Sequence, residues 1–500
     1  MFVDSKRTAL RYMVVLAVGI SIGLGLGYTD VGVGLKSSVE QAATAVKKKG
    51  LEAIVASSDK LGARELLFME YPEMVEAITR GGGFGGDFSR AIAQDIFGES
   101  QEAIDDAKKL SRIVEVAPRT WMIYMPIVNV VLLETDEGLV LIDVGMRAAG
   151  PAIKDLIKTV SDMPIHTIIY THGHVDHAYG TWALTEDNPQ IVAHEDLPKR
   201  FDRYIRLRGS LAKYNAQPLQ SLPASESDLV YPTRTFRDEL TLEIGGEEFI
   251  LRAHRGETND QLYVWIPSRK ALATADYYQG FLPNAGNGKR MQRYPEEWAI
   301  ALREMVAENA QLLLPAHGEA IADPKIIKEN LSVLAETLQF IVDHTIAELN
   351  KGTRKDLVFQ SLQIPELLLN HPTLEVKYVT HEDISKMVIK RYTGWWDDIP
   401  SSWTPVLFED MSAEIVQLAG GVEVIDQRAR SLMDGDIKMA SHLADWAWYA
   451  DPNNPVTQQL VIDVYRERVI HNETNTMEML NYIQAMTEAR QMQLDTAREE

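Results

Sequence analysis

Four side chains able to bind a metal fall within six residues of this chain, directly after a short apolar stretch. His172, His174, Asp176 and His177 follow the apolar residues 168–170. Because a loop at the end of a strand can point neighbouring side chains in different directions, two histidines can hold one ion while Asp176 and His177 hold a second. Neutral imidazoles and carboxylates suit zinc, and also iron or manganese. The segment therefore predicts a two-metal site at the end of a buried strand.

The composition narrows the chemistry further. The 500 residues include no cysteine, which excludes disulfides, a thiolate nucleophile and a zinc site built on sulfur. A formal net charge of -22 argues against a nucleic-acid partner, because a phosphate backbone attracts a basic surface. The length predicts two or three domains.

The N-terminus has the pattern of an export signal or a membrane anchor. Lys6, Arg7 and Arg11 precede an apolar run from Tyr12 to Tyr28, whose length is at the lower limit for a spanning helix. No cleavage site with small residues follows directly. We therefore expect residues 1–30 to be an uncleaved membrane anchor, with a cleaved signal as the alternative. In a bacterial cell, the rest of the chain would be exported to the periplasm and tethered to the inner membrane.

The hydrophobic pattern changes twice after the anchor. Residues 31–110 carry apolar residues at helical spacing, which predicts a helical N-terminal region. Residues 111–330 alternate strand patterns with helix patterns, and we expect them to form an α/β sandwich that holds the metal site. Helical patterns continue through residues 331–500, which predicts a linker and an all-α domain. Four tryptophans are expected to pack between these helices: Trp395, Trp396, Trp446 and Trp448.

The motif HxHxDH after an apolar strand resembles the metallo-β-lactamase superfamily. Other landmarks of that superfamily follow in the expected order, with Asp143 ending an earlier strand and Asp276 and His317 ending later ones. The resemblance implies an αββα sandwich. It also implies that Asp276 bridges two metals, that Asp143 supports the site, and that His317 binds the second metal.

The third ligand of the first metal separates the families within this superfamily. A histidine usually stands in a turn at a set spacing before the bridging carboxylate, and the same spacing counted back from Asp276 reaches Glu257. A glutamate at this position is characteristic of alkyl sulfatases. His254, which comes slightly earlier in the chain, is the rival ligand. An oxygen ligand would add negative charge to the site and lower the Lewis acidity of its ion.

The C-terminal half also resembles alkyl sulfatases. Residues 344–365 look like the segment that joins the catalytic and helical domains of that family, and residues 390–397 (KRYTGWWD) look like its tryptophan-containing signature. Gly420-Gly421 and residues 433–436 look like parts of its dimerisation domain. This resemblance implies a homodimer formed through the C-terminal helices. The sterol-carrier-like domain that ends many members is not expected here.

Two features depart from the family pattern. The bridging carboxylate is Asp276, where the best-known members carry glutamate. Their sulfate-binding segment resembles HN followed by LRGA, and residues 283–290 stand at its place. Asn284 keeps the asparagine position, whereas Lys289 falls at the arginine position with Arg290 beside it. A cation there can still neutralise an anionic head group, so we expect these three residues to bind substrate, although lysine lacks arginine's bidentate fork.

The resemblance implies a binuclear hydrolase with two zinc ions. We expect it to cleave sulfate esters of alkyl alcohols, which are small amphiphilic anions, to alcohol and inorganic sulfate by a metal-bound hydroxide. Asp176 and Asp276 are the expected catalytic carboxylates. One alternative is another hydrolase of this fold, acting on a lactone, thioester, β-lactam or phosphodiester. An iron-bound redox enzyme and a non-catalytic assembly protein are the other two.

Overall fold

The computed structural model describes residues 62–81, 100–215, 219, 222–471 and 475–499, and it divides into two compact units, Gln94–Asp397 and Met1–Ala93 with Asp398–Glu500. The anchor predicted at residues 1–30 lies outside the described residues. None of the helices within the described ranges combines the length and apolar character that a membrane span requires.

The unit Gln94–Asp397 contains two sheets. The first has the strand order β1-β2-β3-β4-β5-β6-β7, and the second has the order β12-β11-β10-β9-β8. The strands of the first sheet are β1 (Arg112–Ala117), β2 (Thr120–Tyr124), β3 (Val130–Glu134), β4 (Leu139–Ile142), β5 (Ile165–Ile169), β6 (Gln190–His194) and β7 (Arg234–Phe236). Those of the second are β8 (Glu239–Ile244), β9 (Glu247–Ala253), β10 (Leu262–Ile266), β11 (Ala271–Ala275) and β12 (Leu312–Pro315).

Side chains along each strand point alternately to the two faces of the sheet, and both faces are covered by other layers of the fold. On β2, Met122 belongs to the core between the two sheets, whereas Trp121 and Ile123 belong to the core on the outer face of the first sheet. Leu251 and Leu314 of the second sheet contribute to the same inner core as Met122. The sheets therefore pack face to face through side chains from alternate positions.

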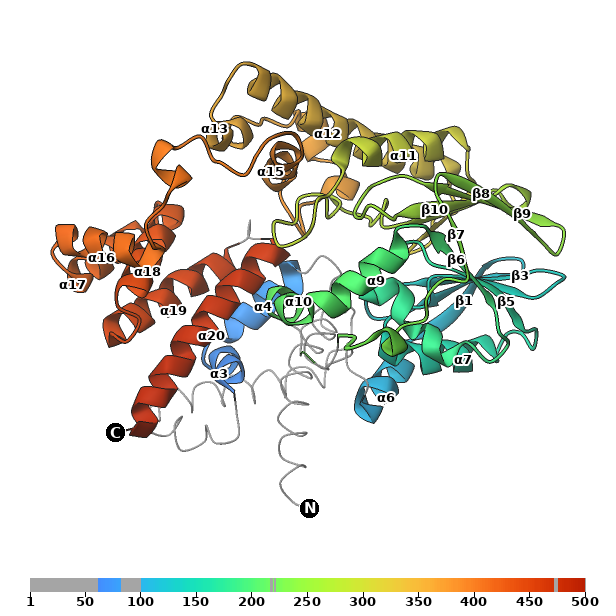
Figure 1. The fold of residues 1–500 in the computed structure, drawn as a ribbon, viewed down its shortest axis with the longest axis horizontal. Helices are drawn as coiled ribbons and strands as arrows, with labels where there is room; N and C mark the ends of the chain where they lie inside the picture. Colours follow the sequence, from blue (N-terminus) through green and yellow to red (C-terminus); the bar gives the residue numbers. More distant parts are fainter. Residues whose placement is uncertain (1–61, 82–99, 216–218, 220–221, 472–474, 500) are drawn as a thin grey trace, which may run out of the picture. The chain divides into compact units, whose positions relative to one another are not determined.

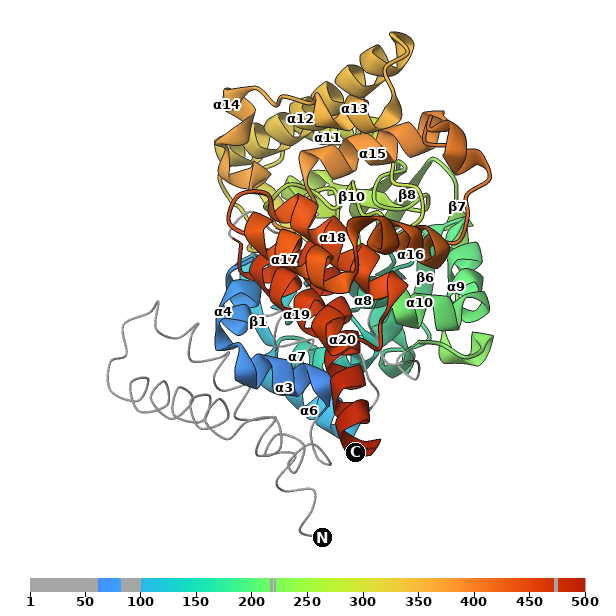
Figure 2. The ribbon, with the colours of Figure 1, turned by 90° about the vertical axis from the view of Figure 1, so that its left-hand side faces the viewer.

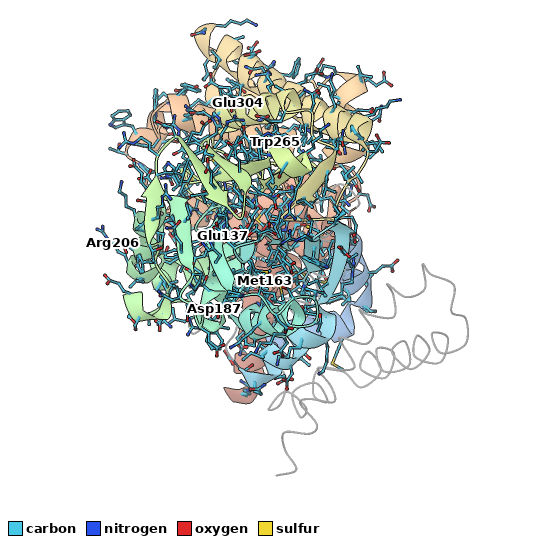
Figure 3. All side chains as sticks on the ribbon, turned by 90° about the vertical axis from the view of Figure 1, so that its right-hand side faces the viewer. Glu137, Met163, Asp187, Arg206, Trp265 and Glu304 are labelled. Atoms are coloured by element: carbon cyan, nitrogen blue, oxygen red, sulfur yellow. The ribbon has the colours of Figure 1, made fainter. Side chains whose placement is uncertain are left out.

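Helices cover the outer face of each sheet. On the first sheet these are α6 (Gln101–Leu110), α7 (Gly150–Ile157), α9 (Leu197–Arg206) and α10 (Arg208–Asn215). Helices α11 (Pro295–Ala307) and α12 (Pro324–Asn350) lie over the second sheet (Figure 1). Figure 3 shows the layers in order, with Glu304 on α11, Trp265 on β10, Glu137 in the turn between β3 and β4, and Met163 after α7. The predicted αββα sandwich followed by a helical C-terminal region is confirmed.

The helical C-terminal region is divided between the two units. Helices α12, α13 (Lys355–Gln360), α14 (Glu366–Leu369) and α15 (His381–Tyr392) belong to the unit that contains the sheets. Helices α16 (Phe408–Ala419), α17 (Val422–Leu432), α18 (Ile437–Ala450), α19 (Pro455–Ile470) and α20 (Thr476–Glu499) belong to the other unit.

The second unit also includes helices from the N-terminal region. Helices α3 (Ala63–Glu70) and α4 (Pro72–Gly81) share one apolar core with α16 to α20, and Figure 2 shows α3 beside α20. Asn454 caps α19 by accepting from the backbone N–H of Val456 at 2.9 Å, and Pro455 occupies the first helical position. Segments far apart in the sequence thus form one helical bundle.

The expected packing of the four tryptophans is only partly correct. Trp446 and Trp448 pack against the core of the helical unit. Trp395, by contrast, is 76% exposed and follows the end of α15. Its position in a loop after the last turn of the helix, rather than on a helical face, explains the difference.

Candidate metal centre

The HxHxDH segment is held between the two sheets. Strand β5 ends at Ile169, and the chain then turns into the short helix α8 (Val175–Ala178). The carbonyl of Thr171 accepts from the backbone N–H of Leu262 at 2.9 Å, which ties the segment to β10 of the second sheet. The N–H of Gly173 donates to Asp260 Oδ2 at 2.8 Å, and a Cβ at Gly173 would lie 3.2 Å from the same oxygen. Glycine thus permits the close approach of this loop to Asp260.

Seven side chains form two adjoining groups of potential ligands. The first group contains His172, His174, Glu257 and Asp276, and the second contains Asp176, His177 and His317. Within each group, one ligand atom per residue lies within 4.8 Å of all the others. Four of the seven follow β5 of the first sheet, whereas Glu257, Asp276 and His317 follow strands of the second. The site therefore exists only where the two sheets meet.

Asp276 lies between the two groups. Its Oδ1 lies 3.1 Å from His317 Nε2 and 3.3 Å from His177 Nε2, whereas its Oδ2 lies 3.8 Å from His172 Nε2. The residue before it, Ala275, has a φ of 48°, a left-handed conformation that non-glycine residues rarely adopt. One carboxylate thus offers one oxygen to each group, which is the arrangement that a bridging ligand requires.

Backbone and side-chain acceptors fix the orientation of three histidines. His177 Nδ1 donates to Asp143 Oδ2 at 2.7 Å, and His317 Nδ1 donates to the carbonyl of Ile127 at 2.7 Å. Thr171 Oγ1 donates to Asp143, so it accepts from His172 Nδ1 at 3.1 Å. With Nδ1 hydrogen-bonded in each ring, Nε2 is the nitrogen that faces Asp276 at the centre.

Replacing Asp143 by asparagine is expected to weaken metal binding about 10- to 100-fold, the usual effect of losing a hydrogen-bond partner of a metal ligand. An amide can turn an N–H toward His177 Nδ1 and so favour the wrong tautomer. Zinc affinity, measured by competition with a chromophoric chelator, checks this prediction. Asp155→Asn, on the surface of α7, is the matched control and should bind zinc like the parent. Equal affinity of both variants would contradict the proposed role of Asp143.

Burial and neighbouring charges determine the protonation of the ligands. Burial lowers the pKa of His172 and of His174 well below the usual value, so both rings are neutral and can bind metal. Burial also acts to lower the pKa of His177, but the carboxylate of Asp276 and other acidic groups outweigh it and raise this pKa. At Asp276, burial acts to raise the pKa, but the charges of His177 and His317 outweigh it and hold this pKa well below normal. Asp276 is therefore ionised.

The donor set fits divalent metal ions. Among the described residues, His177 Nε2, Asp276 Oδ1 and Glu257 Oε2 are buried and have no hydrogen-bond partner. Buried polar atoms normally find a partner, and a lone-pair donor without one is costly to bury. Cations bound at the two groups would satisfy all three atoms. This cluster of His, Asp and Glu side chains thus has the composition and geometry of a metal site.

The structure places Glu257, and not His254, among the potential ligands. Glu257 is buried and shares the first group with His172 and His174. His254 Nε2 lies 2.7 Å from Glu304 Oε2, and its ring stacks on Tyr263 at a centroid distance of 6.4 Å. His254 thus contacts Glu304 of α11 and Tyr263 of β10, on the face of the second sheet that α11 covers.

The three predicted substrate-binding residues lie in the loop after β11. Asn284 is buried, and its Nδ2 donates to Glu257 Oε1 at 2.6 Å. Lys289 and Arg290 are partly exposed, and neither has an ion-pair partner among the described residues. Burial and the charge of Arg290 lower the pKa of Lys289. The contact of these residues with a substrate stays a prediction.

Three further residues at the centre were not predicted from the sequence. Arg200 Nη2 lies 2.9 Å from His174 Nε2, and Asp260 Oδ2 accepts from the backbone N–H of Gly173. Arg293 is 1% exposed, and its Nη2 lies 2.9 Å from Glu257 Oε1. None of them belongs to a short motif, and each contacts the centre from a different segment. A buried arginine in a loop has no local sequence signal that distinguishes it from a surface arginine.

Comparison with known families agrees with this architecture. Residues 124–317 match the metallo-beta-lactamase superfamily, and residues 354–492 match the alkyl sulfatase dimerisation family. The chain carries a metallo-β-lactamase domain and an alkyl sulfatase dimerisation domain.

The chain is also similar to curated alkylsulfatases, which are sulfuric ester hydrolases. It is 24% identical over 365 residues to a linear primary-alkylsulfatase of Pseudomonas sp., covering 67% of this chain and 69% of the relative. It is 21% identical over 481 residues to an (R)-specific secondary-alkylsulfatase of Pseudomonas sp., covering 85% and 72%. A stereoselective inverting sec-alkylsulfatase from Pseudomonas sp. has the same fold, with a TM-score of 0.69 at 18% identity, covering 87% of this chain and 77% of that one. The predicted resemblance is confirmed.

Proposed function

We propose that this protein is a binuclear, zinc-dependent alkyl sulfatase that releases inorganic sulfate and an alcohol from alkyl sulfate esters. The observation that carries the proposal is the carboxylate of Asp276, which offers one oxygen to each of two ligand groups. The similarity of the chain to alkylsulfatases supports the sulfate ester as substrate.

Each ligand group would hold one ion. His172, His174 and Glu257 would hold the first, and Asp176, His177 and His317 would hold the second, with Asp276 shared between them. When bound, the ions supply Lewis acidity and lower the pKa of water to near neutrality. The side chain of Asp176 is 21% exposed, compared with 4% for Asp276. Asp176 is therefore the carboxylate better placed to accept a hydrogen bond from a water molecule that enters with the substrate.

Lys289 and Arg290 would bind the sulfate group. Both cations are without an acidic partner in the described part of the chain, although the protein as a whole has a charge of -22. Arg290 is also near enough to His174 and Tyr378 for its charge to act on the pKa of both groups, which supports a sulfate site beside the first ligand group. An anion between the two cations would offset their mutual repulsion and stabilise the negative charge that develops on the leaving group.

Arg290→Gln is expected to raise KM for a long-chain alkyl sulfate about 10- to 100-fold, because a hydrogen bond to a charged group contributes about 1.5–3 kcal/mol. Arg303→Gln, at an exposed position on α11, is the matched control. Sulfate release from decyl sulfate, followed at several substrate concentrations, measures both. An unchanged KM for Arg290→Gln would remove this residue from the substrate site.

The reaction itself is tested by sulfate release from decyl sulfate by the zinc-loaded protein beside His174→Ala. Sulfate release by the parent but not by His174→Ala supports both the proposed metal centre and the proposed alkyl sulfate substrate. If the folded parent binds two metals per chain and releases no sulfate, the assignment as a hydrolase of this fold stands but alkyl sulfates are excluded as substrates. Lactones and phosphodiesters would then be assayed. Incorporation of ¹⁸O from labelled water into sulfate, or instead into the alcohol, distinguishes S–O from C–O cleavage.

The protein is proposed to be a homodimer through its dimerisation domain. Helix α16 exposes Met411 and Leu418, and Leu407 just before it is also exposed. An apolar stripe of this kind is costly in water and is typical of an interface between subunits. Leu418→Glu is expected to shift the protein from dimer to monomer in light scattering coupled to gel filtration, whereas the exposed Glu414→Gln should leave the dimer intact. A dimeric Leu418→Glu would exclude this stripe as the interface.

We also propose that the protein is exported and tethered by residues 1–30. The basic residues before the apolar run support this topology. Protease treatment of spheroplasts that degrades the catalytic domain would support it, and full protection would overturn it.

A further inference from the structure

The two carboxylate oxygens of Glu257 differ in their hydrogen-bond partners. Oε1 accepts from Asn284 Nδ2 at 2.6 Å and lies 2.9 Å from Arg293 Nη2. Oε2 is equally buried and has no hydrogen-bond partner among the described residues. One oxygen is therefore occupied by two donors, and the other is left for the group of potential ligands that contains His172 and His174.

Arg293 also contacts the backbone of Glu257. Its Nη1 donates to the main-chain carbonyl of Glu257, while Nη2 contacts the carboxylate. The N–H of Glu257 itself donates to Gln261 Oε1 at 2.7 Å. Both the backbone and one side-chain oxygen of Glu257 are thus fixed, which leaves the carboxylate little freedom to turn its second oxygen elsewhere.

Glu257 is the acidic partner of the Arg293 guanidinium. The guanidinium is 1% exposed, and Glu257 is the one residue with which it forms an ion pair among the described residues. Burying an arginine is expensive unless it is paired and hydrogen-bonded. With Glu257 ionised, as a metal ligand must be, Arg293 and Glu257 together carry no net charge.

We propose that Arg293 and Asn284 make Glu257 a one-oxygen ligand whose charge is neutralised, so that it replaces a neutral histidine in the first ligand group. His172 and His174 each offer one nitrogen without charge. The pair of Glu257 and Arg293 offers one oxygen and adds no net charge. The first metal is thereby kept at one donor atom per residue, and its Lewis acidity is preserved although one ligand is a carboxylate. Arg293 and Asn284 are positioning residues, since they act through Glu257.

This inference rests on the proposed metal centre but does not depend on the proposed substrate. Its test therefore measures metal binding, not sulfate release. If the parent protein binds no zinc, the metal centre itself fails. If the parent binds two zinc ions and the variants below behave like the parent, the role of Arg293 fails.

The experiment compares Arg293→Gln, Glu257→His and the double variant in the full chain. Zinc affinity is measured by chelator competition, and cobalt-substituted protein is examined by absorption spectroscopy for coordination number. Arg293→Gln is expected to bind the first zinc about 10- to 100-fold more weakly. Glu257→His leaves the buried guanidinium without an anion beside an imidazole and should bind zinc more weakly than the parent. In the double variant a neutral glutamine faces the new histidine, so its affinity should recover at least about 10-fold over Glu257→His alone.

Three further variants keep the outcome decisive. Arg293→Lys retains the charge but cannot contact both the carboxylate and the backbone carbonyl, and it should lie between the parent and Arg293→Gln. Arg255→Gln removes an exposed arginine just before Gly256 in the same loop and should bind zinc like the parent. If Arg293→Gln does not fold, Asn284→Ala removes one of the two donors to the same oxygen, and its cobalt spectrum should shift from that of the parent toward a higher coordination number. Unchanged affinity in Arg293→Gln, no recovery in the double variant, or an unchanged cobalt spectrum in Asn284→Ala would each overturn the proposal.

Discussion

Asp276→Asn is expected to reduce sulfate ester hydrolysis roughly 1000-fold or more and to release at least one metal ion. The ionised carboxylate of Asp276 faces His172 on one side and His177 and His317 on the other. An amide has no charge, and only its oxygen can serve as a ligand. Because metal ions contribute several kcal/mol to the stabilisation of the transition state and each increment of about 1.4 kcal/mol is tenfold in rate, losing the shared ligand costs about three orders of magnitude.

Metal content by mass spectrometry and kcat/KM for decyl sulfate, measured on the same preparation, check this prediction. Asp238→Asn is the matched control, because this aspartate is exposed just before β8. Its metal content and rate should equal those of the parent. An Asp276→Asn protein that retained two ions and its full rate would show that the two ligand groups do not share a carboxylate.

Arg490→Met is expected to destabilise the helical unit by about 3 kcal/mol, near the lower end of the usual cost of breaking a buried ion pair. Arg490, on α20, forms an ion pair with Glu70 at the end of α3, and the arginine side chain is 3% exposed. Removing the arginine leaves a largely buried carboxylate that has lost its partner, a change that typically costs about 3–5 kcal/mol. The value expected here is at the lower end, because the side chain of Glu70 is 22% exposed.

Hydrogen exchange resolved by mass spectrometry measures this loss locally, because peptides from α3 and α20 should exchange faster while those from the sheets do not. In the double variant Glu70→Leu, Arg490→Met, both charges are removed, and much of the stability should return. An equal loss in the single and double variants would show that packing of the arginine stem, and not the ion pair, holds α3 in place.

The fold was predictable wherever local pattern determines structure. The strand Ile165–Ile169 and the ligands after it are adjacent in sequence, so one motif identifies both. Asp143 and Asp276 also end predicted strands. By contrast, the association of α3 with α20 joins segments from distant parts of the sequence, and no local periodicity encodes such a contact.

The site residues that belong to sequence motifs could be predicted. Those that reach the site only by contacts between distant segments of the chain could not. The spacing before Asp276 favoured Glu257 over His254, but only the pairing of His254 with Glu304 explains where the histidine lies. Arg293 was not identified because its importance depends on a contact with Glu257, which belongs to a different segment of the chain. Asn284 was identified from the family pattern as a substrate contact, whereas the structure shows its amide donating to Glu257.

The division of the seven potential ligands between the two sheets has a consequence for the lifetime of the protein. With the proposed ions in place, each ion is a cross-link between the halves of the sandwich, and it can form only after both halves have folded and met. A ligand that binds only the folded state stabilises it, by about 2.7 kcal/mol when its free concentration is about 100 times Kd. Chelation would then loosen the sandwich and expose it to proteolysis. The supply of metal would thus govern how long each molecule survives as well as how fast it works.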